Sequence, residues 1–227
     1  MIWTFWEGKK PAYIDLCMRT WQQDHVILTY ENLNRFTELN IDRVKRFTLP
    51  QIADCVRVHV LRDNGGVWLD ADTIMLTGRL PKTNMIGNPI TRTQSIGYLR
   101  TEANSEMFKL WARQQDEVIN RPDTPRNWDV MGNAFTDPYV KEHQDITICN
   151  IDNAFPEIYM LPPAFTRLEK YKMFYFEDSY NLEDIKCTDI IMLHNSWTPQ
   201  SYKDLSEEEV LEKNCTLSNI LREVLEK

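Results

Sequence analysis

Short apolar runs alternate along the chain with segments whose apolar residues recur every three or four positions. Residues 2–6, 26–30 and 67–70 are short apolar runs bounded by polar residues or glycine, which is typical of strands. Residues 12–23 and 49–62 have the spacing of amphipathic helices. This alternation of strands and helices predicts the α/β class.

The second half of the chain has fewer periodic segments. Residues 106–121 have helical periodicity, and a capping box of Ser206 and Glu209 starts a predicted C-terminal helix. Residues 121–138 are rich in proline, asparagine and aspartate and are predicted to form a loop. The remaining apolar runs are predicted strands or strand continuations: residues 74–76, 89–93 and 190–193.

The charge balance and the cysteine content exclude several classes of protein. The net charge is −8 without a Lys/Arg-rich block, which argues against a nucleic-acid partner. No apolar run reaches the roughly 18–20 residues of a membrane span, and the N-terminus lacks the pattern of a secretory signal. Five cysteines without a C-x-x-C pair fit reduced thiols. We therefore expect a cytoplasmic protein without a transmembrane segment, with docking at the inner face of the membrane left open.

The most informative segment surrounds the apolar run at 67–70. The run ends in two carboxylates, Asp70 and Asp72, and residues 74–76 are expected to continue the strand beyond them. Side chains two residues apart in a strand point to the same face, so this pair can share one cation. Hard oxygen ligands suit Mg²⁺ or Mn²⁺, and such an ion binds substrate phosphates. In an acidic protein, the cation would compensate the charge of a diphosphate.

The helix and the turn before this strand extend the pattern. A capping box starts the predicted helix at 49–62. On that helix Asp54 and Arg57 are three residues apart and share one face, where Arg57 can pair with Asp54 or with a phosphate. Gly65 and Gly66 then allow a tight turn or positive φ, and they are expected to leave space for a ligand.

These residues together resemble the D-x-D glycosyltransferases of the capsular-polysaccharide and initiating-mannosyltransferase type. The family pattern D-x-x-R-x-x-x-L-x-x-x-G-G-x-aromatic-x-D-x-D is filled at every fixed position from Asp54 to Asp72, with Trp68 at the aromatic position. The resemblance implies a GT-A fold, which is Rossmann-like, with a central mixed sheet flanked by helices. It also implies a nucleotide-sugar donor, often a UDP-sugar, with Mn²⁺ or Mg²⁺ as cofactor.

The same resemblance implies transfer of a hexose to a saccharide acceptor, which can be lipid-linked, with retention of the anomeric configuration. It places the whole chain, residues 1–227, in a single glycosyltransferase domain. The nucleotide-binding part is expected over residues 1–100 and the part that closes over the acceptor over residues 101–227. The product would be a polysaccharide or oligosaccharide, such as a capsule.

Four further positions are assigned by the resemblance. Trp6 follows the family's opening strand and can stack on the base of the donor. His194 follows an apolar strand and would complete the metal shell, with Trp197 close behind it. Asn133 falls in a loop that contacts donor or acceptor in relatives. The candidate sites are therefore metal ligands Asp70, Asp72 and His194, catalytic residues Asp70, Asp72 and Arg57, and donor-binding residues Trp6, Asp54, Arg57, Gly66, Asp70, Asp72, Asn133 and Trp197.

Two alternatives remain open at this point. Residues 69–73 also resemble the D-x-D-x-T nucleophile motif of haloacid-dehalogenase-type phosphatases, with Thr73 one position earlier than in that motif; such an enzyme would use Asp70 and Asp72 to release phosphate from a sugar phosphate. That fold normally carries the motif on its opening strand, whereas a long segment precedes it here. The second alternative is a non-catalytic protein of the same fold that binds a sugar nucleotide or a glycan.

Overall fold

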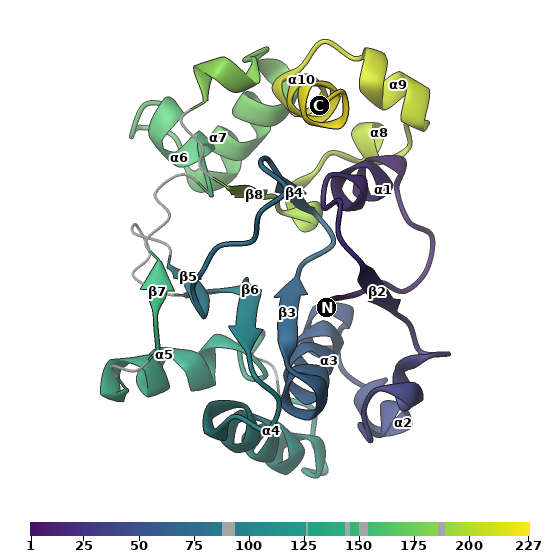
Figure 1. The fold of residues 1–227 in the computed structure, drawn as a ribbon, viewed down its shortest axis with the longest axis vertical. Coiled ribbons are helices and arrows are strands. Elements are labelled where there is room, and N and C mark those ends of the chain that lie inside the picture. The colour runs from purple at the N-terminus through teal and green to yellow at the C-terminus, as the bar shows by residue number, and fades with distance from the viewer. Residues whose placement is uncertain (88–93, 126, 144–145, 150–153, 186–188) are drawn as a thin grey trace. The chain divides into compact units, whose positions relative to one another are not determined.

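The computed structural model describes residues 1–87, 94–125, 127–143, 146–149, 154–185 and 189–227 (Figure 1). The chain divides into two compact units whose segments alternate along the sequence. Unit 1 consists of Met1–Glu7, Asp24–Asp70 and Lys82–Asn150, and unit 2 consists of Gly8–Gln23, Ala71–Pro81 and Ile151–Lys227. Each unit has strands and helices of its own.

Unit 1 is built on a six-stranded mixed sheet with the strand order β2-β1-β3-β6-β5-β7. Its strands are β1 (Ile2–Phe5), β2 (His25–Leu28), β3 (Gly66–Leu69), β5 (Met85–Gly87), β6 (Gln94–Thr101) and β7 (Ile148–Cys149). β1 is parallel to both of its neighbours, β2 and β3, whereas β6 is antiparallel to β3 and to β5. The predicted α/β class, with a central mixed sheet flanked by helices, is confirmed.

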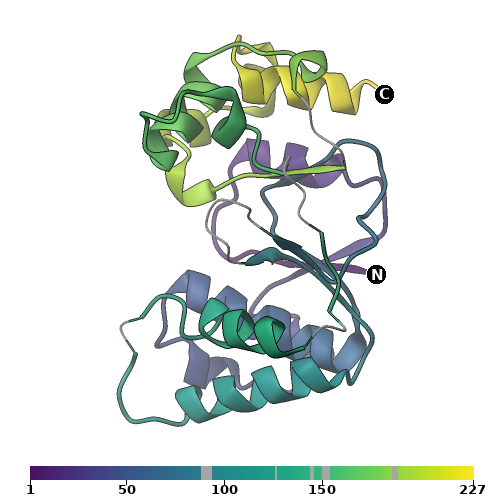
Figure 2. The same ribbon diagram turned by 90° about the vertical axis from the view of Figure 1, so that its left-hand side faces the viewer.

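The helices of unit 1 lie on one face of this sheet (Figure 2). They are η1 (Leu33–Arg35), α2 (Ile41–Val44), α3 (Leu49–Asn64), α4 (Glu106–Ile119) and α5 (Asn133–Glu142). The capping box of Thr48 and Gln51 starts α3, as predicted, because its polar side chains satisfy N–H groups that the first turn leaves unpaired. α3 packs against β1, β3 and α4, and the core between them includes the fully buried rings of Trp68 and Trp111.

The turn between α3 and β3 requires two glycines. Gly65 and Gly66 have φ angles of +64° and +98°, which side chains disfavour. A Cβ on Gly65 would lie 2.5 Å from the backbone nitrogen of Ala103, and one on Gly66 would lie 2.6 Å from the carbonyl oxygen of Met1. The expected positive φ is therefore confirmed. The expected space for a ligand is not found, because neighbouring backbone fills it.

Unit 2 is mainly helical and contains one antiparallel pair of strands, β4 (Thr73–Met75) and β8 (Ile190–Met192). Its α-helices are α1 (Ala12–Arg19), α6 (Glu157–Met160), α7 (Arg167–Lys172), α8 (Gln200–Lys203), α9 (Glu207–Glu212) and α10 (Thr216–Leu225). Its short turns are η2 (Met173–Glu177), which is π-helical, and the 3₁₀ turns η3 (Leu182–Asp184) and η4 (Asn195–Trp197). Over the described ranges of both units, no helix has the length and apolar character to cross a membrane.

Most of the predicted elements are found, with ends that differ by a few residues. They are the strands at 2–6, 26–30, 67–70 and 190–193 and the helices at 12–23, 49–62 and 106–121, which appear as β1, β2, β3, β8, α1, α3 and α4. The predicted strand near 89–93 lies outside the described residues.

The residues between β3 and β4 correct the prediction of one continuous strand. β3 ends at Leu69, Ala71 and Asp72 form a turn, and β4 belongs to the separate sheet that it forms with β8. Thr73 pairs with Met192, so the partner of β4 is distant in the sequence and leaves no local signal. The rule that places side chains two residues apart on one strand face therefore does not apply to the aspartate pair.

Two further predictions are wrong. Residues 121–138 are not all loop, since α5 begins among them and includes Pro138. Packing of α5 against β6 and α4 overrides its unfavourable composition. The predicted C-terminal helix is two helices: the capping box starts α9, and α10 begins after Cys215, whose extended backbone interrupts the helix.

Candidate active site

The site residues of unit 1 gather where β1 and β3 end. These strands are parallel neighbours, with Trp3 paired to Trp68, so the residues that follow them leave the sheet at the same edge. Trp6 follows β1, and Asp70 follows β3. The indole Nε1 of Trp6 is buried and has no hydrogen-bond partner within the described ranges. Trp6 therefore keeps an unused donor at the sheet edge that also carries Asp70.

Arg57 links two carboxylates at this edge. Its Nη2 lies 3.1 Å from Asp54 Oδ1 and 3.2 Å from Asp70 Oδ1. Its guanidinium carbon lies 5.1 Å from the ring centroid of Trp68, and its Nη1 donates to the carbonyl oxygen of Ile96. The side chains of Arg57 and Asp54 are buried, whereas that of Asp70 is 36% exposed. Asp70 is thus the carboxylate of this cluster that a ligand can reach.

Trp68 fixes Asp70 directly as well. The indole Nε1 of Trp68 donates to Asp70 Oδ1 at 2.8 Å, and the backbone N–H of Asp70 donates to the carbonyl oxygen of Gly97 at 2.9 Å. Oδ1 of Asp70 therefore accepts a hydrogen bond from the indole of Trp68 and forms an ion pair with the guanidinium of Arg57. Its Oδ2 has no partner in the part of the chain that the structure describes, so one oxygen is held by the protein and the other is available to a ligand.

Asp54 has an unusual proton affinity. Burial raises the pKa of its carboxyl from 3.8 to about 7; the charge of Arg57 opposes this shift and that of Asp70 adds to it. Asp54 therefore changes its protonation state near neutral pH. Because Asp54 and Asp70 share the single positive charge of Arg57, the cluster carries net negative charge whenever both carboxyls are ionised.

The segment before α5 packs against this cluster. A Cβ on Gly132 would lie 3.1 Å from Asp54 Oδ2 and 2.6 Å from Ile96 Cδ1, so the segment approaches this closely only with glycine there. Asn133, the next residue, donates from Nδ2 to the carbonyl oxygen of Gln94 at 2.7 Å. The structure therefore brings Asn133 to the same part of unit 1 as Asp54.

Gly66 lies apart from the other predicted site residues of unit 1. It begins β3, whereas Asp70 follows the end of that strand, so about 13 Å of extended chain separates them. A side chain at Gly66 would meet the backbone of Met1 and the ring of Trp3. Gly66 shapes the turn before β3 and does not belong to the group around Asp70.

In unit 2, Asp72 is joined to the residues that follow β8. Its Oδ2 accepts the backbone N–H of Asn195 at 2.7 Å, and its carbonyl oxygen accepts the N–H of Leu193 at 3.2 Å. The hydroxyl of Tyr13 donates to Asn195 Oδ1 at 2.6 Å. His194 is the residue between these two partners, so the fold places Asp72 beside the segment that carries it.

His194 lies among aromatic rings and meets an arginine. Its ring is stacked on Phe155 with centroids 5.8 Å apart, and its centroid lies 4.2 Å from that of Trp197. Its Nε2 lies 3.0 Å from Nη2 of Arg167. A guanidinium can only donate, so Nε2 is the acceptor. Burial lowers the pKa of His194 to about 3, and the charge of Arg167 contributes in the same direction.

The predicted metal ligands differ in how well they fit an ion. Across the described ranges, no three histidine, cysteine or carboxylate side chains lie close enough together to hold a metal. The Nε2 lone pair of His194 already accepts a hydrogen bond from Arg167, so His194 does not fit the ligand role through that atom. Asp70 and Asp72 offer the hard oxygen donors that Mg²⁺ or Mn²⁺ prefers. Each aspartate therefore has the donor chemistry of a ligand for such a cation.

Comparison with known families decides the class of this protein. The family model described as "Capsular polysaccharide synthesis protein" matches residues 1–225. The chain belongs to this family. Its membership confirms the prediction of a glycosyltransferase that acts in capsular polysaccharide synthesis.

Other known proteins add little to this assignment. Among solved structures, the "PaToxG Glycosyltransferase" is similar over 62% of this chain and 68% of its own, with 16% sequence identity and a TM-score of 0.41. A likeness this distant supports no conclusion about the site. The comparison with curated proteins found no match.

Several contacts of this family member were not predicted from the sequence. Trp68 had a usable signal, because it lies two residues before Asp70 and so has its side chain on the same side of the chain. Gln115 donates to the carbonyl oxygen of Asp54 at 3.0 Å, and Arg167 meets His194 across 27 positions of sequence. Neither residue lies in a motif, so only the fold reveals these two partners.

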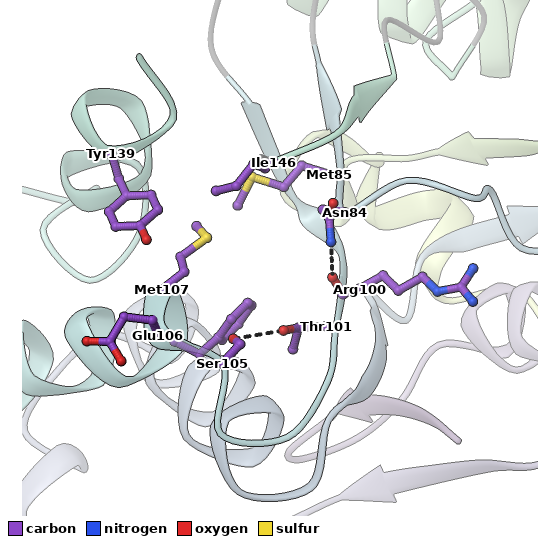
Figure 3. A pocket seen from close by; sticks show the side chains of 10 residues that line it. Asn84, Met85, Arg100, Thr101, Ser105, Glu106, Met107, Tyr139 and Ile146 are labelled. Atoms are coloured by element: carbon purple, nitrogen blue, oxygen red, sulfur yellow. Dashed lines mark hydrogen bonds between the residues drawn. The ribbon is translucent and has the colours of Figure 1, made fainter. Parts of the chain in front are cut away.

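A pocket of about 150 Å³ in unit 1 contains none of the predicted site residues (Figure 3). Its lining residues come from β5, β6, the start of α4, and α5 and the segment after it. Asn84 donates from Nδ2 to the carbonyl oxygen of Arg100 at 3.0 Å, and Thr101 donates to the hydroxyl of Ser105 at 2.8 Å. Several polar groups of the lining thus satisfy one another, and we do not assign this pocket to the donor.

Proposed function

We propose that this protein is a GT-A-type glycosyltransferase that moves a hexose from a UDP-sugar to a saccharide acceptor with retention of configuration. The observation that carries the proposal is the Asp70 carboxylate, which Arg57 and Trp68 hold at a sheet edge with one oxygen available to a ligand. Family membership supports a role in building a polysaccharide. A lipid-linked acceptor and a cytoplasmic location beside the membrane are part of the proposal.

Asp70 and Asp72 are the residues that would hold Mn²⁺ or Mg²⁺. When bound, the cation would neutralise negative charge on the departing diphosphate. Arg57 and Trp68 orient Asp70 without any ligand, and the N–H of Asn195 orients Asp72. Carboxylates that are already oriented lose less conformational entropy when they bind, which favours tight binding.

The remaining predicted residues have roles toward the donor in this proposal. Trp6, at the same sheet edge as Asp70, stacks on the uracil. Asp54 and Asn133 face the hydroxyl groups of the donor sugar. Trp197 contacts the donor from unit 2.

The position of Asp54 bears on how transfer with retention would proceed in this proposal. Asp54 is only 7% exposed and is paired with Arg57, which makes it a poor nucleophile for a covalent sugar intermediate. We therefore favour attack by the acceptor hydroxyl from the side of the leaving group. An oxygen of the leaving diphosphate then accepts the hydroxyl proton, and the new bond forms on the face from which the old one broke.

The phosphatase alternative receives no support from the fold. The D-x-D-x-T motif would belong on the opening strand, but it follows β3, which is the third strand along the chain. Membership of a polysaccharide synthesis family also favours transfer of a sugar over release of phosphate. A non-catalytic binding role would be seen as donor binding without turnover in the experiment below.

The proposal is tested with a panel of nucleotide sugars, each with Mn²⁺, with Mg²⁺ and with a chelator. We expect one donor to raise the melting temperature only when metal is present, and the same donor to be hydrolysed slowly or transferred to a glycan. Anomer analysis of the product by NMR reports retention or inversion. Absence of metal-dependent stabilisation by every donor would contradict the proposal.

Substitution of the aspartates tests their role directly. Asp70→Asn and Asp72→Asn each remove a charged oxygen ligand, and we expect each to lower turnover by about 10²–10³-fold. Circular dichroism should show an unchanged fold. Asp123→Asn, which changes an exposed aspartate of the loop before α5, is the matched control and should retain turnover. Turnover of Asp72→Asn close to that of the wild type would refute the metal role.

A further inference from the structure

Arg167 is held in a defined position by its neighbours in unit 2. Its guanidinium carbon lies 5.1 Å from the ring centroid of Phe155 and 5.4 Å from that of Trp197. Its Nη2 donates to Nε2 of His194 at 3.0 Å. The side chain is partly buried, so two aromatic rings and one imidazole orient the guanidinium while part of it stays open.

The positive charge of Arg167 meets no carboxylate among the described residues. In the described part of unit 2, no acidic oxygen lies within ion-pair distance of its guanidinium. Glu157 influences Arg167 electrostatically, but its carboxylate is fully buried and accepts instead from the hydroxyl of Tyr175 at 3.2 Å. The Nε of Arg167 is buried and makes no hydrogen bond with any described residue. In a chain with a net charge of −8, an arginine whose hydrogen-bond partner is an imidazole has its charge available to an anion.

Arg167 is also connected to the proposed site. Its partner His194 lies between Leu193 and Asn195, and the backbone N–H groups of those two residues both donate to Asp72. Arg167 therefore contacts the residue that lies between the two backbone N–H donors of Asp72, a proposed cation ligand. All of these contacts lie within unit 2.

We infer that Arg167 binds a phosphate group and that His194 acts as its positioning residue, not as a metal ligand. The planar guanidinium matches two phosphate oxygens at once, which an ammonium group cannot do. This inference rests on the proposed function in one respect: the phosphate belongs either to the donor diphosphate or to a phosphorylated acceptor. The chemistry that Arg167 recognises is the same in both cases.

Binding of inorganic pyrophosphate, measured by calorimetry in the presence of a chelator, tests the role of Arg167. We expect Arg167→Gln to weaken binding by about tenfold or more, because charged hydrogen bonds are lost. The pyrophosphate affinity of Arg167→Lys should lie between those of Arg167→Gln and the wild type, since lysine keeps the positive charge but cannot donate to two oxygens in the planar geometry of a guanidinium. Arg113→Gln, at an exposed arginine of α4, is the control and should bind as the wild type does. Equal affinities for the wild type and a folded Arg167→Gln variant would overturn the inference, and so would failure of the wild type to bind.

The source of the phosphate is identified by comparing two ligands. If the donor supplies it, Arg167→Gln weakens binding of UDP in the presence of Mn²⁺, and binding of methyl phosphate to the complex saturated with UDP and Mn²⁺ is the same in variant and wild type. If the acceptor supplies it, Arg167→Gln leaves binding of UDP unchanged and weakens binding of methyl phosphate to that complex. Asp70→Asn separates this inference from the proposed function, because that variant should lose transfer while retaining metal-free binding of pyrophosphate.

The role of His194 is tested by rescue. His194→Gln can place an amide oxygen close to the position of Nε2, so it should restore the pyrophosphate affinity that His194→Ala loses. Affinity for Mn²⁺ without donor, followed by electron paramagnetic resonance, should stay within about twofold of the wild type in both variants, whereas Asp72→Asn should weaken it. Loss of Mn²⁺ affinity by about tenfold or more in both His194 variants would show that His194 is a metal ligand and would overturn its assignment.

Discussion

Two regions of this protein place an arginine against a tryptophan ring near a buried acid, and they use the arginine differently. In unit 1, Arg57 lies over Trp68 and bridges two carboxylates. In unit 2, Arg167 lies over Trp197 and donates to the imidazole of His194, and no carboxylate of the described ranges is in contact with it. Burial raises the pKa of the nearby acid to about 7 in both regions, at Asp54 in the first and Glu157 in the second.

The difference lies in the net charge that remains for a ligand. Two carboxylates around one guanidinium leave the first region negative when both are ionised, which favours a cation. A guanidinium beside a neutral imidazole leaves the second region positive when Glu157 is protonated, which favours an anion. A metal ion carries the positive charge that the first region favours, and a diphosphate carries the negative charge that the second region favours. The same pair of side chains, arginine on tryptophan, is therefore structural in unit 1 and available for binding in unit 2.

The largest expected effect is on stability, and it separates the two arginines. Arg57→Gln leaves the buried Asp54 without its counter-charge, and breaking a buried ion pair in this way costs about 3–5 kcal/mol. Arg167→Gln breaks no ion pair and should cost about 1 kcal/mol through loss of its contacts with the aromatic rings. Urea unfolding at pH 8, where Asp54 is mostly ionised, gives both free energies.

A double variant provides the control for this comparison. Asp54→Asn removes the buried charge, so Arg57→Gln should cost much less in an Asp54→Asn background than in the wild type. No such coupling is expected between Asp54→Asn and Arg167→Gln. Equal costs for the two arginine substitutions in the wild type would break the distinction between the regions.

The first region was largely predictable from the sequence, for a local reason. Asp54 and Arg57 lie three residues apart on a helix that a capping box starts, so their shared face and their ion pair follow from helical geometry. Gly65 and Gly66 are likewise adjacent residues whose backbone requirement is local. The ion pair of Asp54 and Arg57 and the positive φ of the two glycines were therefore predictable from neighbouring residues.

The second region depends on contacts that no local pattern records. Arg167 is 27 positions from His194, and Asp72 is 123 positions from Asn195. The turn at Asp72 exists because β4 pairs with a strand near the end of the chain. The sequence predicted His194 as a metal ligand together with Asp70 and Asp72, and it carried no signal for the contact between His194 and Arg167.

The next effect in size is a pH dependence of stability that both buried acids should produce. The pKa values of Asp54 and Glu157 rise from 3.8 and 4.5 to about 7, so between pH 5 and 7 these two carboxyls bind more protons in the folded protein than in the unfolded chain. The contribution of each carboxyl to the free energy of unfolding therefore falls as the pH rises, by at most about 1.4 kcal/mol per pH unit. Asp54→Asn and Glu157→Gln each remove one contribution.

The measured quantity is the free energy of unfolding of each variant minus that of the wild type at each pH. This is necessary because His59 and His194 have pKa values lowered by burial to about 4 and about 3, and they act in the opposite direction over the same range. The stability of each variant relative to the wild type should rise from pH 5 to pH 7. A relative stability that stays flat for one variant would show that its acid titrates normally and that the two regions are less alike than their burial indicates.

The smallest expected effect compares the two tryptophans. Trp68→Phe keeps a ring under Arg57 but loses the hydrogen bond from Nε1 to Asp70, which should cost about 1 kcal/mol in addition to the packing that the smaller ring loses in the core. Trp197→Phe keeps a ring under Arg167, and the Trp197 indole makes no hydrogen bond within the described residues, so its cost should be smaller. Because Asp70 would lose a fixed donor, Trp68→Phe should also lower turnover by about tenfold with little change in melting temperature. If both variants lost the same stability, the indole hydrogen bond would not be what holds Asp70, and the orientation of that carboxylate would have to come from Arg57 alone.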